Sequence, residues 1–163
     1  MNTETTASNV VVRELRGTDT AAAERAFAAL DADPDTRRWF HPHPLTAAEA
    51  RRVCSHGGRD VHLGAFLGPV MVGYALLRGW DEGFDVPSFG VAVIPQQRGA
   101  GVGEALASAA IELARASDAE EVLLHVHPSN RLATRWYERL GFTPSHMRDD
   151  GLVAYRLRLA GGT

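Results

Sequence analysis

The sequence predicts a mixed α/β fold with seven strands and four helices in a single domain. Three observations support this prediction. The 163 residues, of which 45% are hydrophobic, suffice to bury one substantial core and are too few for two full domains. Apolar residues recur with strand-like and helix-like spacings, in an order that is not a regular alternation of strand and helix. Between residues 93 and 104, glycines separate a strand-like segment from a helical one.

The first third of the chain predicts a strand, a helix, a loop and a short helix. Residues 10–15 are apolar enough for a strand, and residues 19–30 are an alanine-rich stretch with helical spacing. Prolines interrupt residues 31–44, so we expect loop or short turns there. Residues 46–54 begin with a threonine that a glutamate follows three positions later, which is the spacing of a capping box and predicts a short helix.

The middle of the chain predicts three strands. Residues 61–67 and 70–78 are strand-like runs on either side of a Gly-Pro pair, which indicates a hairpin. A connection over residues 79–87 leads to a strand over residues 88–94, which Pro95 ends because proline cannot donate to a sheet ladder.

The last third predicts a long helix followed by three strands, with a second helix after the first of them. Apolar side chains recur every three or four positions over residues 101–116, which favours a helix with one apolar face. Residues 122–126 predict a short buried strand, and residues 143–147 and 152–159 predict two closing strands around an Asp-Asp-Gly turn.

The second helix is expected to start after a capping Ser129 or Asn130 and to stop at Gly141, since glycine tolerates the left-handed conformation of a helix end. Its spacing predicts one inward face. The residues on that face are Leu132, Ala133, Trp136, Tyr137 and Leu140.

Composition excludes several classes of partner. A net charge of −3 gives no general attraction to nucleic acid or to anionic membranes, so we expect neither as a partner. Cys54 is the single cysteine and cannot form an intramolecular disulfide, which fits a reducing compartment and a small buried side chain. No apolar run reaches the roughly 18 residues that span a bilayer, and the N-terminus lacks the pattern of a secretion signal. We therefore expect a soluble cytoplasmic domain over residues 1–163, with residues 1–9 flexible.

The glycine-rich loop predicts an anion site, because backbone N–H groups and the positive end of a helix dipole meet there. A Walker loop requires lysine after its last glycine, and Glu104 follows Gly103 here. A dinucleotide fingerprint requires a third glycine where Glu104 stands. The pattern Arg/Gln-x-x-Gly-x-Gly/Ala fits instead, starting either from Arg98 or from Gln96.

This loop, VIPQQRGAGVGEAL, and the later stretch VHPSNRLATRWYERLGF at residues 126–142 resemble the GNAT superfamily of acyl-CoA-dependent N-acyltransferases. The order of elements over residues 10–159 fits that family as well. The resemblance implies a mixed, mostly antiparallel central sheet of about six to seven strands flanked by four helices. It also implies an acetyltransferase that moves an acetyl group from acetyl-CoA, or another acyl group from its acyl-CoA, to a primary amine.

The resemblance further implies roles for the matching positions. Backbone amides of the glycine loop would bind the pyrophosphate of coenzyme A, and the preceding strand would pair with the amides of pantetheine. Asn130 would lie beside the cofactor, and Tyr137 near its sulfur. Asn130 also fits a plain helix cap, and Tyr137 a plain core residue. The coenzyme-binding residues implied are Val91, Ala92, Val93, Arg98, Gly99, Ala100, Gly101, Val102, Gly103, Asn130 and Tyr137.

Transfer to an amine needs a base, because a lysine-like amine has a pKa of about 10.4 and is protonated at neutral pH. Glu82, Asp85 and His127 are the candidate bases, with a water chain as the alternative. Tyr137 is the candidate acid for the departing thiolate. Because the sequence offers no Ser-His-Asp set for a covalent intermediate, we expect direct attack in a ternary complex.

We expect the amine acceptor to bind between the proline-rich loop after the first helix and the connection before the cofactor strand; we call this region the acceptor side. The competing interpretations are packing over the core for the loop and a solvated turn for the connection. The candidate substrate-binding residues are Trp39, Phe40, His41, His43, Trp80 and Phe84. The histidine pairs His41-x-His43 and His125-x-His127 lack a further acid or cysteine ligand, so we expect no metal.

The identity of the acceptor stays open. A small-molecule amine is favoured over a protein N-terminus or lysine, and a non-catalytic acyl-CoA-binding module is a further alternative that the presence of Tyr137 disfavours. A homodimer is open too.

Overall fold

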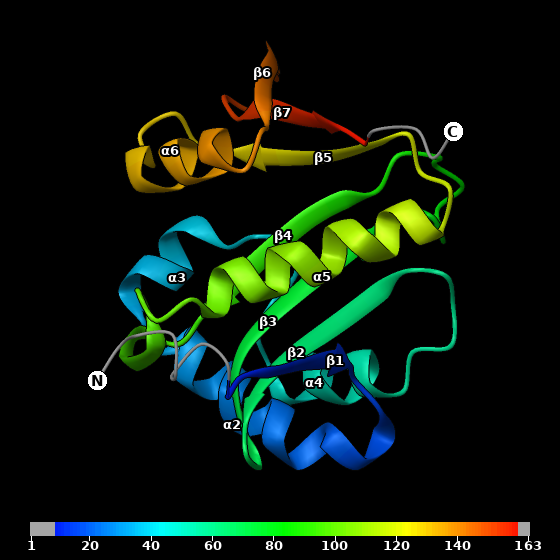
Figure 1. Ribbon diagram of the computed structural model, residues 1–163. Helices are drawn as coiled ribbons and strands as arrows, with labels where there is room; N and C mark the ends of the chain where they lie inside the picture. The colour runs from blue at the N-terminus through cyan, green and yellow to red at the C-terminus, as the bar shows by residue number, and fades with distance from the viewer. Residues whose placement is uncertain (1–8, 160–163) are drawn as a thin grey trace.

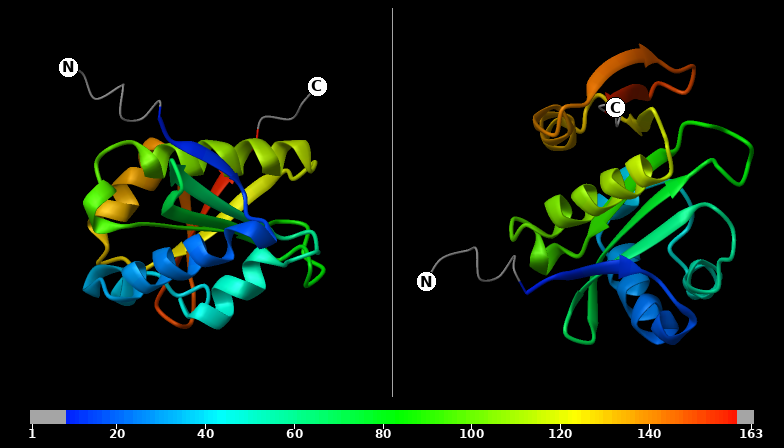
Figure 2. Two further views of the ribbon diagram at one scale, coloured as in Figure 1. Left: turned by 90° about the horizontal axis from the view of Figure 1, so that it is seen from below. Right: turned by 45° about the vertical axis from the view of Figure 1, so that its right-hand side comes forward.

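The computed structural model describes residues 9–159, which form three layers with a sheet in the middle (Figures 1 and 2). Asn9 apart, the N-terminal segment that we predicted to be flexible lies outside the described residues. The elements in chain order are β1 (Val11–Glu14), η1 (Gly17–Asp19), α2 (Thr20–Asp31), α3 (Pro34–Trp39), α4 (Ala47–Cys54), β2 (Val61–Leu67), β3 (Val70–Arg78), β4 (Ser88–Val93), η2 (Pro95–Gln97), α5 (Val102–Ala116), β5 (Glu121–Val126), α6 (Arg131–Arg139), β6 (Thr143–Met147) and β7 (Val153–Arg158).

The seven strands form one sheet in the order β1-β2-β3-β4-β5-β7-β6. Neighbouring strands are antiparallel except β4 and β5, which run parallel. The prediction of a mixed, mostly antiparallel sheet of six to seven strands is confirmed.

Two sequence predictions are wrong. Residues 31–44 were expected to lack a helix, yet Pro34–Trp39 form α3, so the described residues hold five α-helices. Pro34 fits the first helical turn, where no N–H partner is needed, and the Asp33 carboxylate caps the helix by accepting from the Thr36 N–H at 2.9 Å. Leu132 was expected to face inward and is 83% exposed, because it lies on the first turn of α6 on the side away from the core.

The helices cover opposite faces of the sheet. Helices α5 and α6 pack on one face, and α2, α3 and α4 lie on the other (Figure 2). Cys54 is buried in the smaller core between α2, α4 and the sheet. None of the helices among residues 9–159 is long and apolar enough to cross a membrane.

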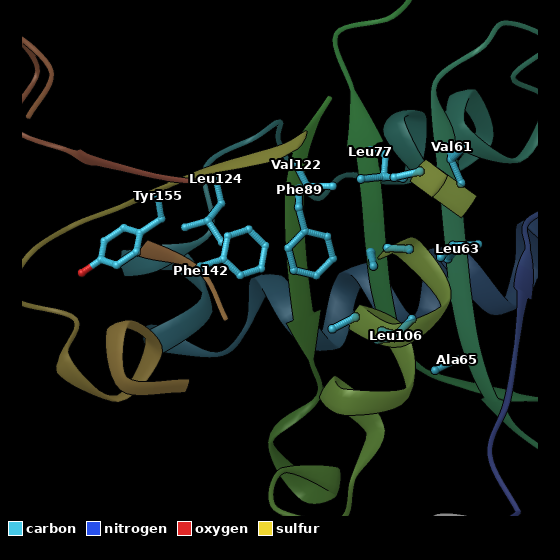
Figure 3. Packing of buried hydrophobic residues seen from close by; sticks show 14 of the residues in the cluster. Val61, Leu63, Ala65, Leu77, Phe89, Leu106, Val122, Leu124, Phe142 and Tyr155 are labelled. Atoms are coloured by element: carbon cyan, nitrogen blue, oxygen red, sulfur yellow. The ribbon is translucent and has the colours of Figure 1, made fainter. Parts of the chain in front are cut away.

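The larger core runs under α5 and α6 from β2 across to β7 (Figure 3). Alternate residues of β5 point into it, as the two-residue period of a strand dictates. Phe142, just after α6, lies beside Phe89 of β4 and Leu124 of β5 in this cluster. These buried rings hold β4 and β5 on one common core even where the two strands no longer pair.

Candidate active site

The parallel strands β4 and β5 pair at only one point and then diverge. Their single bridge joins Ser88 to Leu123, and the Leu123 N–H donates to the Pro87 carbonyl at 2.9 Å. Beyond it, residues 89–93 of β4 and 124–126 of β5 separate; we call the space between them the splay. Its closed end is at Ser88, and its open end is where both strands terminate (Figure 1).

Backbone groups of both strands point into the splay. The Ile94 N–H donates to the Val72 carbonyl, and hydrogen-bonded and non-bonded pairs alternate along an antiparallel ladder. The N–H and C=O groups of Val91 therefore point away from β3 and toward β5. On the other side, Leu159 donates to Glu120, and the same alternation turns the backbone groups of His125 toward β4. Backbone N–H and C=O groups in the middle of a sheet require hydrogen-bond partners, and a bound ligand can supply them.

The glycine loop, residues 98–103, lies at the open end of the splay. Gly99 and Gly101 have φ values of 79° and 89°, in the left-handed region that favours glycine. The loop leads directly into α5, which begins at Val102, so the free N–H groups of its first turn and its positive dipole end lie here. Gly103 differs from Gly99 and Gly101 in that its φ is not positive. A Cβ on Gly103 would point at the Trp136 ring, 3.4 Å from the nearest ring atom.

The Arg98 side chain turns from the loop toward α3. Its guanidinium donates to the Asp33 carboxylate at 2.6 Å, to the Thr36 hydroxyl at 3.1 Å and to the Val93 carbonyl at 3.2 Å. The Arg98 and Thr36 hydrogen bonds lower the pKa of Asp33 to about 2, so Asp33 is ionised at neutral pH.

Helix α6 starts at Asn130, whose side-chain oxygen accepts from the Ala133 N–H at 3.3 Å; the capping interpretation is confirmed. Two turns later, Tyr137 packs its ring against Trp136 and Phe142, at centroid distances of 5.1 and 5.9 Å. Burial raises the pKa of Tyr137 to about 12, so the phenol keeps its proton at neutral pH. The protonated phenol cannot act as a base, and its raised pKa makes it a weaker acid than free tyrosine.

On the opposite face, the end of α3 reaches the end of β5. The ring of Trp39 lies 5.6 Å from the ring of His127, centroid to centroid. The Ser129 N–H donates to Nδ1 of His127 at 3.1 Å, so in the neutral ring Nε2 carries the proton. At the open end of the splay, Trp39 therefore contacts His127 on one face, and the Trp136 ring lies next to Gly103 on the other.

The loop between α3 and α4 lies over β4. A Cβ on Gly90 would come within 3.1 Å of Pro42, and Arg78 of β3 donates to the Pro42 carbonyl. His41 is exposed, with Nε2 2.6 Å from the Arg38 carbonyl. Phe40, His41 and His43 line a surface pocket of about 460 Å³, together with neighbouring residues of α2, α3 and the loop.

His43 is committed to partners within the protein. Its Nδ1 lies 2.7 Å from the Pro44 carbonyl, and its Nε2 lies 2.8 Å from the hydroxyl of the buried Tyr74. Both nitrogens are therefore used within the protein, Nδ1 inside the loop and Nε2 in holding the loop to β3.

The candidates from the connection before β4 lie at the other end of the splay. Glu82, Phe84 and Asp85 precede Ser88 and are exposed, and Trp80 is 5% exposed within the larger core. His127 follows the bridge residue Leu123 by four positions, about 13 Å along the strand. The structure therefore does not bring His127 together with Glu82 and Asp85.

Sequence reasoning missed the link from Asp33 to Arg98 and the buried Tyr74, which joins His43 to His62. The order Asp-Pro-Asp-Thr at residues 33–36, a cap followed by proline at the first helical position, could have revealed α3. Among residues 9–159 no group of three His, Cys, Asp or Glu side chains is placed to hold a metal ion.

Comparison with known proteins identifies relatives in two functional classes. The chain is 36% identical over 88 residues to a mycothiol acetyltransferase of Corynebacterium aurimucosum, covering 52% of this chain and 28% of that protein. The chain thus spans less than a third of the length of this longer relative. It is 30% identical over 141 residues, 86% of this chain and 85% of the relative, to a Bacillus subtilis protein with a proposed activity as ribosomal protein bS18-alanine N-acetyltransferase.

Solved structures share the fold at low identity. The GNAT domain of PAT from S. lividans superposes with a TM-score of 0.78 at 21% identity, covering 91% of this chain and 89% of that one. A Salmonella typhimurium protein solved with its cofactor acetyl-CoA superposes with a TM-score of 0.67 at 23% identity, covering 94% and 96%. The model of the acetyltransferase (GNAT) family matches residues 24–142. With most of its length matched and the same fold, the chain belongs to the GNAT family of acetyltransferases.

Proposed function

We propose that this protein transfers an acetyl group from acetyl-CoA to a primary amine by direct attack in a ternary complex formed at the splay. The observation that carries the proposal is the pair of strands that leave backbone groups unpaired in the middle of a sheet, with a glycine loop at their open end. An extended ligand with amide groups and a phosphate end satisfies both features, and the pantetheine arm and pyrophosphate of coenzyme A form such a ligand.

In this proposal the coenzyme lies along β4. The N–H and C=O groups of Val91, and the N–H of Val93, pair with the amides of pantetheine. Ala92 makes no hydrogen bond to the coenzyme, because its N–H and C=O groups face β3. The N–H groups of the glycine loop hold the pyrophosphate at the start of α5, and Asn130 lies beside the coenzyme at the start of α6.

Acetyl transfer requires a stabilised thioester oxygen, a proton for the departing thiolate, and an amine that has lost its own proton. A backbone N–H of β4 that points into the splay stabilises the negative charge that develops on the thioester oxygen. Tyr137, protonated at neutral pH, donates its proton to the departing thiolate. Because the pKa of the phenol, about 12, lies above that of the conjugate thiol, near 8.5, this transfer requires the hydroxyl to be held close to the sulfur. The C–S bond breaks as the C–N bond forms, the nitrogen gives up its second proton to water, and the Tyr137 phenolate takes a proton back from water as the product amide and coenzyme A leave.

The amine must lose a proton before it attacks, and we assign this step to water at the open end. His127 in its present tautomer offers Nε2–H as a donor, and its basic Nδ1 already accepts from Ser129. Glu82 and Asp85 lie toward the closed end of the splay, beyond Ser88. His127 then serves to orient the acceptor together with Trp39, whose ring it contacts.

A small-molecule amine is the first candidate acceptor, since the Trp39 and His127 rings beside the open end of the splay offer a small contact surface. A protein N-terminus is the second, and one observation favours it: the Bacillus subtilis relative with proposed bS18-alanine acetyltransferase activity matches over 85% of its own length.

An amine panel tests the proposal. Acetyl-CoA is incubated with the protein and either spermidine, glucosamine, L-lysine or a hexapeptide with N-terminal alanine, and free thiol is measured along with the mass of the product. We expect amine-dependent thiol release with one acetyl group added to one class of acceptor. The second candidate is supported if the hexapeptide alone reacts. Thiol release at the same rate with and without every amine would contradict acetyl transfer to this class of acceptor.

A further inference from the structure

The ion pair between Asp33 and Arg98 joins two segments that are 65 positions apart in the chain. The Arg98 guanidinium donates hydrogen bonds to three groups. They are the Val93 carbonyl at the end of β4, the Asp33 carboxylate before α3, and the Thr36 hydroxyl within α3. The same Asp33 oxygen accepts from the Thr36 N–H and hydroxyl, at 2.9 and 2.8 Å. Asp33 therefore holds α3 and Arg98 at once.

Helix α3 carries this connection across the open end of the splay. Its first residues are tied to the end of β4 through Arg98, and its last residue, Trp39, contacts His127 after the end of β5. A helix of six residues spans about 9 Å, which makes it a short rigid connector between the two strands. Figure 1 shows α3 beside the loop that precedes α5, in agreement with the Arg98 contacts to Asp33 and Thr36.

The guanidinium is held in this arrangement by two of its three nitrogens: Nε donates to the carbonyl, and Nη2 donates to the hydroxyl and the carboxylate. Turning the side chain away toward a phosphate would break these bonds and leave the 12%-exposed Asp33 side chain without its cation. Within the loop, the N–H groups of Arg98 and Ala100 donate to the Pro95 and Gln97 carbonyls, which leaves those of Gly99, Gly101 and the first turn of α5 for an anion. The Arg98 side chain links the position of this loop to α3.

We propose that Asp33 is a positioning residue which, through Arg98, couples the conformation of the glycine loop to the placement of α3 and Trp39 over the acceptor side. This inference rests on the proposed function, in which the loop binds the coenzyme and Trp39 borders the acceptor. When acetyl-CoA orders the loop, Arg98 is held in place, and α3 is held with it. Acceptor binding then depends on a carboxylate that touches neither substrate.

Hydrogen exchange measured with and without acetyl-CoA tests the coupling. In the wild-type protein we expect acetyl-CoA to slow amide exchange both in the glycine loop and in residues 35–40. Asp33→Asn keeps an oxygen that can cap α3 and removes the charge that pairs with Arg98. In this variant we expect protection of the loop to remain and protection of residues 35–40 to fall about fivefold or more. The acceptor KM should rise with it, at unchanged acetyl-CoA affinity, for the amine of the panel that reacts fastest.

Two further variants sharpen the test. Glu112→Gln breaks the exposed pair with Arg115 on α5 and should change neither protection nor KM. Arg98→Lys keeps a cation without the planar fork, and should weaken the protection of residues 35–40 in the same direction as Asp33→Asn. If Asp33→Asn retains full protection of residues 35–40, or lowers acetyl-CoA affinity as much as acceptor affinity, the coupling is overturned. If acetyl-CoA protects no loop residue in the wild type, the proposed coenzyme site fails, and the coupling fails with it.

Discussion

Tyr74→Phe removes one hydroxyl from the centre of the smaller core. Tyr74 is 0% exposed, and its oxygen lies 2.8 Å from His43 Nε2 and 2.8 Å from His62 Nδ1. The Pro44 carbonyl can only accept, so His43 Nδ1 carries a proton, and burial lowers the pKa of His43 and keeps the ring neutral. Tyr74 must then donate to His43 Nε2, and His62 must donate to the Tyr74 oxygen.

The cost of the substitution follows from this assignment. Phenylalanine keeps the ring and its contacts but ends both hydrogen bonds and leaves a histidine donor and a histidine acceptor unpaired in the core. A lost hydrogen bond costs about 1 kcal/mol, and a buried polar group left unsatisfied costs about 1–3 kcal/mol. We expect a loss of about 2–4 kcal/mol in the free energy of unfolding, which lowers the Tm of a domain of this size by about 5–15 °C.

Thermal and urea unfolding at pH 7.5 measure the effect, with Tyr155→Phe as the matched control. The Tyr155 hydroxyl makes one long hydrogen bond, 3.4 Å to Glu138, so its loss should lower the Tm by no more than about 2 °C. A Tm for Tyr74→Phe that is as high as that of the control would refute the argument that the two histidines depend on this hydroxyl.

Burial lowers the pKa of His62 to about 3, so the stability that the neutral ring contributes is complete above its unfolded pKa of 6.5 and is lost as pH falls toward 3. Wild-type urea stability should therefore fall about 2 kcal/mol more between pH 6 and pH 4 than that of His62→Gln; equal losses would contradict this pKa. Gly101→Val should raise the Kd for acetyl-CoA about tenfold or more, because Gly101 is left-handed, while Gly103→Ala should bind nearly as wild type because its Cβ points at Trp136; calorimetry giving equal affinities for both variants would rule this out. Tyr137→Phe should lower kcat about 10²-fold with Tm and acetyl-CoA affinity nearly unchanged, and full kcat under chemistry-limited conditions would assign the proton to another group.

Most of the fold could be predicted because it depends on local patterns. Alternating apolar residues in β5, the Gly-Pro turn between β2 and β3, and the cap at Asn130 each act within a few positions of the chain. Helix α3 is not predicted by proline content alone, because proline breaks a helix in its interior but suits its first position, where its fixed φ fits. Here Asp33 caps the helix by accepting from the N–H and hydroxyl of Thr36.

The candidate site was predictable only in part. The glycines at 99 and 101 predict backbone that other residues rarely adopt, and both have positive φ in the structure. The spacing of seven residues between Asn130 and Tyr137 predicts that one helix carries both along the same face. The pairing of Asp33 with Arg98 depends on which segments the sheet topology brings together, and no local pattern encodes it.

The roles of the histidines could not be predicted from the sequence either. Both ring nitrogens of His43 are used within the protein, and a main-chain N–H sets the tautomer of His127. A residue type shows which donors and acceptors a side chain offers, whereas its partners in the folded chain decide which of them remain free.

A crystal structure of the complex with acetyl-CoA would locate the coenzyme relative to the splay. We expect pyrophosphate oxygens within hydrogen-bond distance of N–H groups of the glycine loop, and pantetheine paired with Val91 in the splay. We also expect the thioester sulfur within about 4 Å of the Tyr137 hydroxyl, close enough for proton transfer. Coenzyme bound outside the splay, or a sulfur too far from Tyr137 for a direct or single-water contact, would contradict this placement.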